Sequence, residues 1–85
     1  MEYARARGAL PPELQGLRAS QLRAAIDDTT LGTLDAEISR LYFIDRMPLA
    51  DVGAIVGYDR RTVARHAAAA AKRISLTAQG YNLPQ

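Results

Sequence analysis

The fold is decided by residues 49–74, which read LADVGAIVGYDRRTVARHAAAAAKRI. This stretch predicts a short helix, a tight turn at Gly57 and a longer second helix over residues 60–74. Gly57 has no Cβ atom, so it can adopt a positive φ without a steric clash and end the first helix. Two helices joined by so short a turn are typical of a helix-turn-helix, whose second helix enters the major groove of DNA.

The residues expected at the contact between the two helices have side chains whose sizes suit close packing. Val52, Val56 and Val63 fall at positions that we expect to be buried between the helices. Gly53 lies one turn before the bend, where a close approach of the second helix leaves room only for a small residue. Asp59 stands just before the second helix, where its carboxylate can accept hydrogen bonds from the first free amides of that helix.

Three short segments of the longer run 41–74 carry a resemblance to a known family. An acidic-apolar-small triplet at 51–53 is followed by an apolar-glycine turn at 56–58 and by a cap, two arginines, Thr and Val at 59–63. This pattern resembles the helix-turn-helix domains of region four of bacterial sigma factors, and especially small phage-encoded transcription regulators. The resemblance covers residues 33–75. Pro48 and His66 depart from the pattern, which usually has a Ser or Thr cap and an aliphatic residue there.

Charge is distributed unevenly along the chain, although the net charge is only +2. Residues 1–26 carry four Arg and two Glu (net +2), and residues 27–59 carry seven acids and two Arg (net −5). Residues 60–85 carry four Arg, one Lys and no acid, for a net charge of +5. The basic segment begins where the second helix begins, and such clustering is typical of a protein with a polyanionic partner.

Arg60 and Arg61 are the strongest candidates for contact with nucleic acid. Positive charge at a helix N-terminus opposes the helix dipole, so folding gives no reason to place two arginines there. An arginine fork matches the O6 and N7 acceptors of guanine. Adjacent helical residues point about 100° apart, so one arginine reaches a base and the other a phosphate. We expect Arg61 and Arg65 on bases and Arg60 on phosphate.

Four further residues of the second helix are weaker DNA-binding candidates. Thr62 suits a thymine methyl group or a phosphate. Lys72 and Arg73 suit phosphates, but their place near the helix C-terminus is explained equally well by the helix dipole. His66 suits either a phosphate contact or a partly buried structural position, and the structural role is the favoured interpretation of a lone histidine.

The rest of the chain predicts an all-α protein, a small bundle of about four helices. One helix is expected over residues 13–28, bent or divided at Gly16, and another from Thr33 to about residue 46. We divide the chain into an N-terminal arm (1–9), one helix-turn-helix domain (10–75) and a non-helical tail (76–85). Arg5 and Arg7 in the arm are candidates for DNA contact, although a frayed terminus is the favoured interpretation.

Composition excludes several classes of protein. Without cysteine and with one histidine, the chain offers neither a disulfide nor a thiolate metal site, so no metal and no cofactor are expected. No apolar run reaches the roughly 18 residues of a membrane helix. The arginine-containing N-terminus lacks the apolar core of a secretory signal, so we expect a cytoplasmic protein. No nucleophile is spaced beside His66, so no enzyme is expected.

These observations favour a sequence-specific double-stranded DNA-binding protein, and the resemblance implies a phage or mobile-element transcription regulator. Much of the 48% hydrophobic content is alanine, so a lone monomer is expected to be marginal. A homodimer or an association with RNA polymerase is therefore expected. The alternative is a protein-interaction module, in which the acidic middle segment and exposed Tyr42 and Phe43 dock on RNA polymerase or on a phage packaging complex resembling a small terminase.

Overall fold

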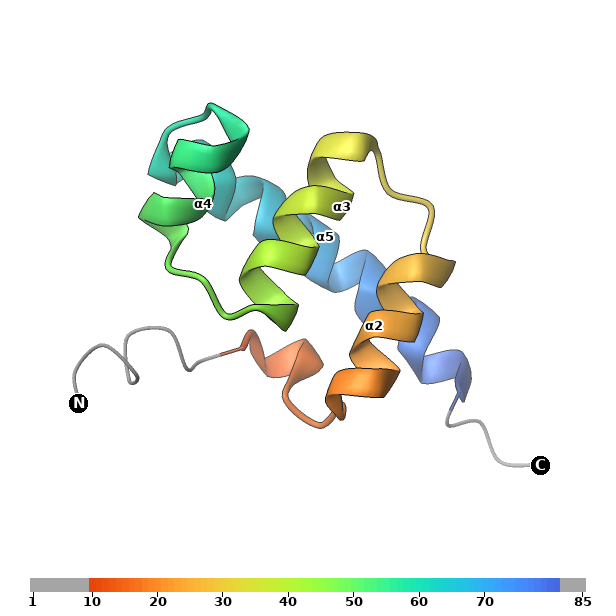
Figure 1. Ribbon diagram of the computed structural model, residues 1–85. Helices are drawn as coiled ribbons and strands as arrows, with labels where there is room; N and C mark the ends of the chain where they lie inside the picture. The colour runs from red at the N-terminus through yellow and green to blue at the C-terminus, as the bar shows by residue number, and fades with distance from the viewer. Residues whose placement is uncertain (1–9, 82–85) are drawn as a thin grey trace, which may run out of the picture.

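The computed structural model describes residues 10–81 and is all-helical over that range (Figure 1). Its elements follow one another in the order η1 (Pro12–Leu14, 3-10 helix), α2 (Ala19–Asp28), α3 (Thr33–Ser39), η2 (Arg40–Ile44, π-helix), α4 (Leu49–Val56) and α5 (Arg60–Tyr81). Four α-helices therefore form a small bundle, and the predicted fold class is confirmed.

The longest helix, α5, is the element against which the others pack. Figure 1 shows it running diagonally behind α2, α3 and α4, and it contacts all three as well as η1. Residues at i, i+4, i+7 and i+11 form its buried stripe: Val63, Ala67, Ala70 and Ile74 are all buried. The alanines in this stripe have little volume, which leaves room for the neighbouring helices to pack against α5.

Phe43 is a central core residue, which corrects one expectation from the sequence. Its side chain is only 1% exposed and packs with fully buried Leu14, Ile38 and Val52. The expected docking surface of Tyr42 and Phe43 is therefore wrong for Phe43. The chain contains a single phenylalanine, and burying so large an apolar ring contributes more to folding than exposing it.

A π-helical turn places Phe43 in the core. The helix expected from Thr33 to about residue 46 is regular only to Ser39, and η2 then continues it with wider turns to Ile44. Arg46, two residues after the end of η2, has a φ of 58°, in the left-handed region. Its Nε atom donates a hydrogen bond to the Phe43 carbonyl oxygen at 3.2 Å, which closes the turn before α4 begins.

The helix expected over residues 13–28 is divided into two, which is one of the two forms that the sequence predicted. η1 ends at Leu14, Gly16 lies in the turn that follows, and α2 begins at Ala19. The Gln15 side chain donates to the Leu10 carbonyl oxygen at 2.8 Å and so holds this turn to the start of the described chain.

The C-terminal end of α5 overturns a second expectation. The helix continues to Tyr81, so the non-helical tail predicted over residues 76–85 is wrong for 76–81, whereas 82–85 lie outside the described residues. The Thr29 and Thr77 hydroxyl groups are hydrogen bonded at 2.7 Å, and the Tyr81 hydroxyl donates to Asp28. This hydrogen bond raises the pKa of Tyr81. Contacts with the end of α2 thus extend α5 despite the low helix propensity of Gly80.

Candidate nucleic-acid interface

The chain bends at Gly57, as predicted. Gly57 has a φ of 86°, which is the left-handed region that only glycine adopts without a steric cost. The amides of Gly57 and Tyr58 both donate to the Gly53 carbonyl oxygen, at 2.8 and 3.1 Å. These two bonds end α4 and turn the chain into the start of α5.

Residue 53 must be a glycine because another part of the chain passes close to it. That part is mainly the turn and not, as expected, the second helix. A Cβ atom on residue 53 would lie 2.5 Å from the Tyr58 carbonyl oxygen and 3.7 Å from a Val63 methyl carbon. The first distance is far below van der Waals contact and the second is an ordinary contact. The carbonyl of the turn, more than the second helix itself, therefore excludes a side chain at this position.

Asp59 caps α5, as expected. Its Oδ1 atom accepts a hydrogen bond from the Thr62 amide at 3.1 Å. Hydrogen bonding from Thr62, by its side chain and then its amide, lowers the pKa of Asp59, and the nearby Arg65 charge lowers it further. The carboxylate is therefore held in its charged form at the positive end of the helix.

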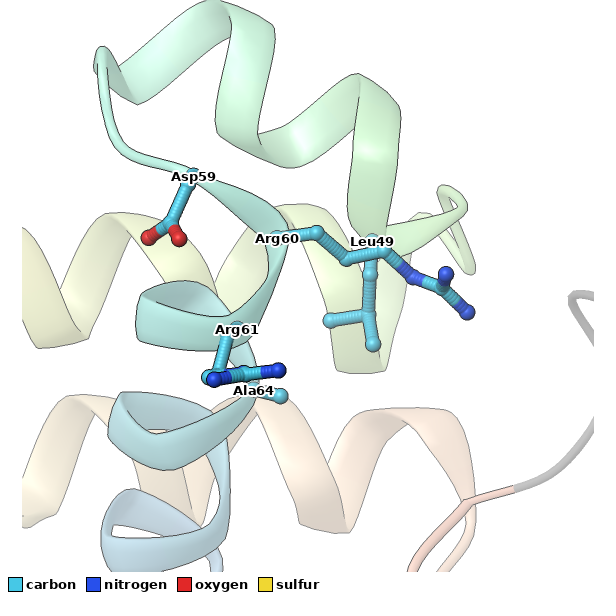
Figure 2. A pocket seen from close by; sticks show the side chains of 5 residues that line it. All are labelled: Leu49, Asp59, Arg60, Arg61 and Ala64. Atoms are coloured by element: carbon cyan, nitrogen blue, oxygen red, sulfur yellow. The ribbon is translucent and has the colours of Figure 1, made fainter.

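Arg60 and Arg61 are exposed at the start of α5 and extend in different directions (Figure 2). Arg60 extends past Leu49 of α4, whereas Arg61 does not. Within residues 10–81, neither guanidinium forms an ion pair or a hydrogen bond. Two cations thus stand free of the described chain at the helix end where positive charge is least favourable.

A hollow of about 580 Å³ lies between the two arginines. It is lined by Leu49, Asp59, Arg60, Arg61 and Ala64, so it joins the start of α4 to the start of α5. Leu49 packs against the core and is only partly buried. Its role in lining the hollow was not predicted, because no local signal in the sequence shows which α4 residue lies beside the first turn of α5.

The exposed face of α5 continues from these arginines along the helix. Arg61, Arg65 and Lys72 lie on the side opposite the buried stripe, with exposed Ala68 and Ala69 between them. Successive residues rise 1.5 Å, so this face spans about 16 Å from Arg61 to Lys72. The small side chains of Ala68 and Ala69 separate Arg65 from Lys72 on this face.

The remaining candidates on α5 are less exposed or lie at the edge of this face. Thr62 is only partly exposed, and its amide donates a hydrogen bond to Asp59. Arg73 is exposed one residue beyond Lys72, and its carbonyl oxygen accepts a hydrogen bond from Thr77. Arg5 and Arg7 lie outside the described residues.

His66 has a structural partner that the sequence did not indicate. Its Nδ1 atom lies 2.6 Å from Oδ1 of Asp35, and the two side chains are 38% and 25% exposed. The His66 ring also lies near Tyr58, with 6.4 Å between centroids. Asp35 is 31 residues away in the chain, so no spacing rule joins the pair. The favoured structural role of His66 is supported, and its contact with DNA stays a prediction.

Searches for other kinds of site and for relatives give no positive result. Over residues 10–81, no three histidine or acidic side chains converge in a way that holds a metal ion. None of the helices described is both long and apolar enough to cross a membrane. Comparison of the chain with family models, curated proteins and solved structures finds no significant match.

Proposed function

We propose that this protein is a sequence-specific double-stranded DNA-binding protein in which α4 and α5 form a helix-turn-helix. The observation that carries this proposal is the pair Arg60 and Arg61, exposed and without a described anionic partner at the N-terminus of α5. An N-terminal cation pair costs folding free energy, so a polyanionic ligand explains it better than folding does.

In this proposal α5 lies in the major groove with its first turns at the base edges. Arg61 and Arg65 contact bases, and guanine is the preferred partner because its O6 and N7 acceptors match the guanidinium fork. Arg60 points to the α4 side of the helix start and contacts the sugar-phosphate backbone. The exposed Ala68 and Ala69 let the helix backbone approach the groove floor.

The other candidates position the domain on the duplex. Lys72 and Arg73 contact phosphates near the far end of the groove. Thr62 contacts a thymine methyl group or a phosphate. His66 contacts a phosphate through Nε2, because Nδ1 is engaged with Asp35.

The biological role that we propose is regulation of transcription in a phage or mobile element. It depends on the resemblance to region four of sigma factors, which is an argument by analogy. An 85-residue domain contacts few phosphates, so we also propose that it acts as a homodimer or together with RNA polymerase.

The experiment is a binding-site selection from random duplex DNA, followed by affinity measurements at several salt concentrations. We expect an enriched duplex sequence, and we expect the logarithm of the binding constant to fall linearly with the logarithm of the salt concentration. Binding that shows neither sequence preference nor salt dependence contradicts the proposal.

The protein-interaction alternative is weakened, because Phe43 is buried and only Tyr42 of the two aromatic residues remains partly exposed. Its other support, the acidic middle segment, remains. A mass measurement in solution separates the two proposals. A monomer or dimer agrees with the regulator, whereas a ring of many copies indicates a packaging protein.

A further inference from the structure

We infer that the hollow between Arg60 and Arg61 reads a thymine, with Leu49 of α4 and Ala64 of α5 in contact with its C5 methyl group. This inference rests on the proposed function and goes beyond it, because it assigns base specificity to a residue outside the helix that occupies the groove. It also predicts what kind of base lies beside the one that Arg61 contacts.

The hollow combines two kinds of surface. Its sides are the two arginines, and its apolar part consists of Leu49 and Ala64. Figure 2 shows the Leu49 side chain extending away from the α4 backbone, and it lines the same hollow as both arginines and Ala64. The hollow therefore offers an apolar surface beside the two guanidinium groups that, in the proposed function, bind the DNA duplex.

Leu49 is well placed to make an outward contact. It is only partly buried, so part of its side chain is free to touch a ligand. It also borders two neighbouring hollows, of about 330 Å³ beside Tyr42 and about 210 Å³ along the alanines of α5. The exposed part of Leu49 thus lies at the meeting point of the three hollows.

The chemistry of the major groove selects the occupant. The base edges present hydrogen-bond donors and acceptors there, and the thymine C5 methyl is the apolar group among them. Guanine and adenine acceptors gain nothing from a leucine and an alanine, and the cytosine amino group loses its water there without a partner. Thymine alone removes apolar surface from water on both sides of the contact.

Asp59 also lines the hollow but does not change this assignment. An aspartate can accept a hydrogen bond from the cytosine amino group. However, Oδ1 of Asp59 is engaged with the Thr62 amide, and Figure 2 shows the carboxylate pointing away from Leu49. A base that touches Leu49 therefore lies on the side of the hollow away from Asp59.

The test uses the full chain and the duplex obtained by selection. Each thymine of the bound site is replaced in turn by deoxyuridine, which removes only the C5 methyl group. We expect one position, next to the base pair that Arg61→Ala relaxes, to lose about fourfold in affinity, the worth of one buried methyl group. Replacing cytosine by 5-methylcytosine in a duplex with a cytosine at that position is expected to restore part of the affinity.

Variants at Leu49 and Ala64 test whether the thymine methyl group lies in the hollow. In Leu49→Ala we expect the thymine-to-deoxyuridine affinity ratio at that position to fall close to one, whereas Leu49→Met retains it. Ala64→Ser, at a partly exposed helix position, introduces a hydroxyl group into the apolar part and also lowers the ratio. This second variant keeps the test decisive if Leu49→Ala fails to fold. Leu76→Ala is the control, because Leu76 is 68% exposed at the other end of α5.

Several results overturn the inference. A wild-type protein that binds its duplex without any thymine-to-deoxyuridine difference contradicts it and leaves the proposed function intact. An unchanged ratio in both Leu49→Ala and Ala64→Ser also contradicts it. Failure to bind any duplex overturns the proposed function together with this inference.

Discussion

Gly53 and Tyr58 approach so closely that a Cβ atom on residue 53 would lie 2.5 Å from the Tyr58 carbonyl oxygen. Neither the turn nor α4 can keep its geometry with a side chain there. We therefore expect Gly53→Ala to lower the free energy of unfolding by at least about 2 kcal/mol, measured by urea denaturation. Gly80→Ala is the matched control, because its Cβ meets nothing within 4 Å and helix propensity favours alanine by about 0.5–1 kcal/mol. Equal stability of Gly53→Ala and the wild type would refute the close approach.

The lowered pKa of Asp59 makes the stability of the folded protein depend on pH. Its pKa in the folded protein is lowered from 3.8 by hydrogen bonding from Thr62. The unfolded chain therefore takes up a proton at this site more readily than the folded chain does. The stabilisation is present above pH 3.8 and disappears as the pH falls through the lower folded-state pKa.

The variant Asp59→Ser isolates this effect, because serine caps a helix without a titratable carboxylate. We expect the melting temperature of the wild type to fall more steeply than that of Asp59→Ser on acidification below pH 4. The measurement is thermal unfolding followed by circular dichroism from pH 7 to pH 2.5. Parallel curves for the two proteins would show that the carboxylate does not act as a charged cap.

The two arginines at the start of α5 are expected to differ in DNA binding. Arg61→Ala is expected to cost about 1–3 kcal/mol in binding and to relax the preference at one base pair. Arg60→Ala is expected to weaken binding to all sequences and to reduce the slope of log affinity against log salt by about 1. Arg23→Ala removes an exposed positive charge from α2 and controls for net charge. If Arg23→Ala weakens binding as much as the other two variants, α5 is not the contact surface.

The contact between Nδ1 of His66 and Oδ1 of Asp35 joins α5 to α3 and is partly exposed to solvent. A double-mutant cycle of His66→Ala and Asp35→Ala is expected to give a coupling free energy of about 0.5–1 kcal/mol. The measurement is chemical denaturation of the four proteins. A second cycle with Glu37→Ala, which changes an exposed acid on the same helix, should give a coupling close to zero. Equal coupling in both cycles would mean that the contact with Asp35 is not specific.

The last turns of α5 are attached through Thr77, whose hydroxyl group meets that of Thr29 at 2.7 Å. We expect Thr77→Ala to lower the free energy of unfolding by about 1 kcal/mol, the net worth of a hydrogen bond. Leu76→Ala, one residue away and 68% exposed, should change stability by less than about 0.5 kcal/mol. Should Thr77→Ala be as stable as the wild type, this end of α5 is not docked on α2.

Four features follow from the amino-acid sequence alone: the all-α fold, the bend at Gly57, the Asp59 cap and the buried stripe of α5. These features depend on local rules that a single stretch of chain contains. A missing Cβ permits a positive φ, a carboxylate before a helix finds free amides, and apolar residues repeat with the helical period. The candidate arginines were identified in the same way, since a charge at a helix end is also a local property.

Packing between distant segments sets how far α5 extends, where Phe43 lies and which residues meet at the hollow. Thr29 and Thr77 are 48 residues apart in the chain, Asp28 and Tyr81 are 53 apart, and Asp35 and His66 are 31 apart. Contacts over such separations outweigh local propensities of about 1 kcal/mol, as at Gly80. The π-helical turn that buries Phe43 and the place of Leu49 beside Ala64 depend in the same way on packing between helices.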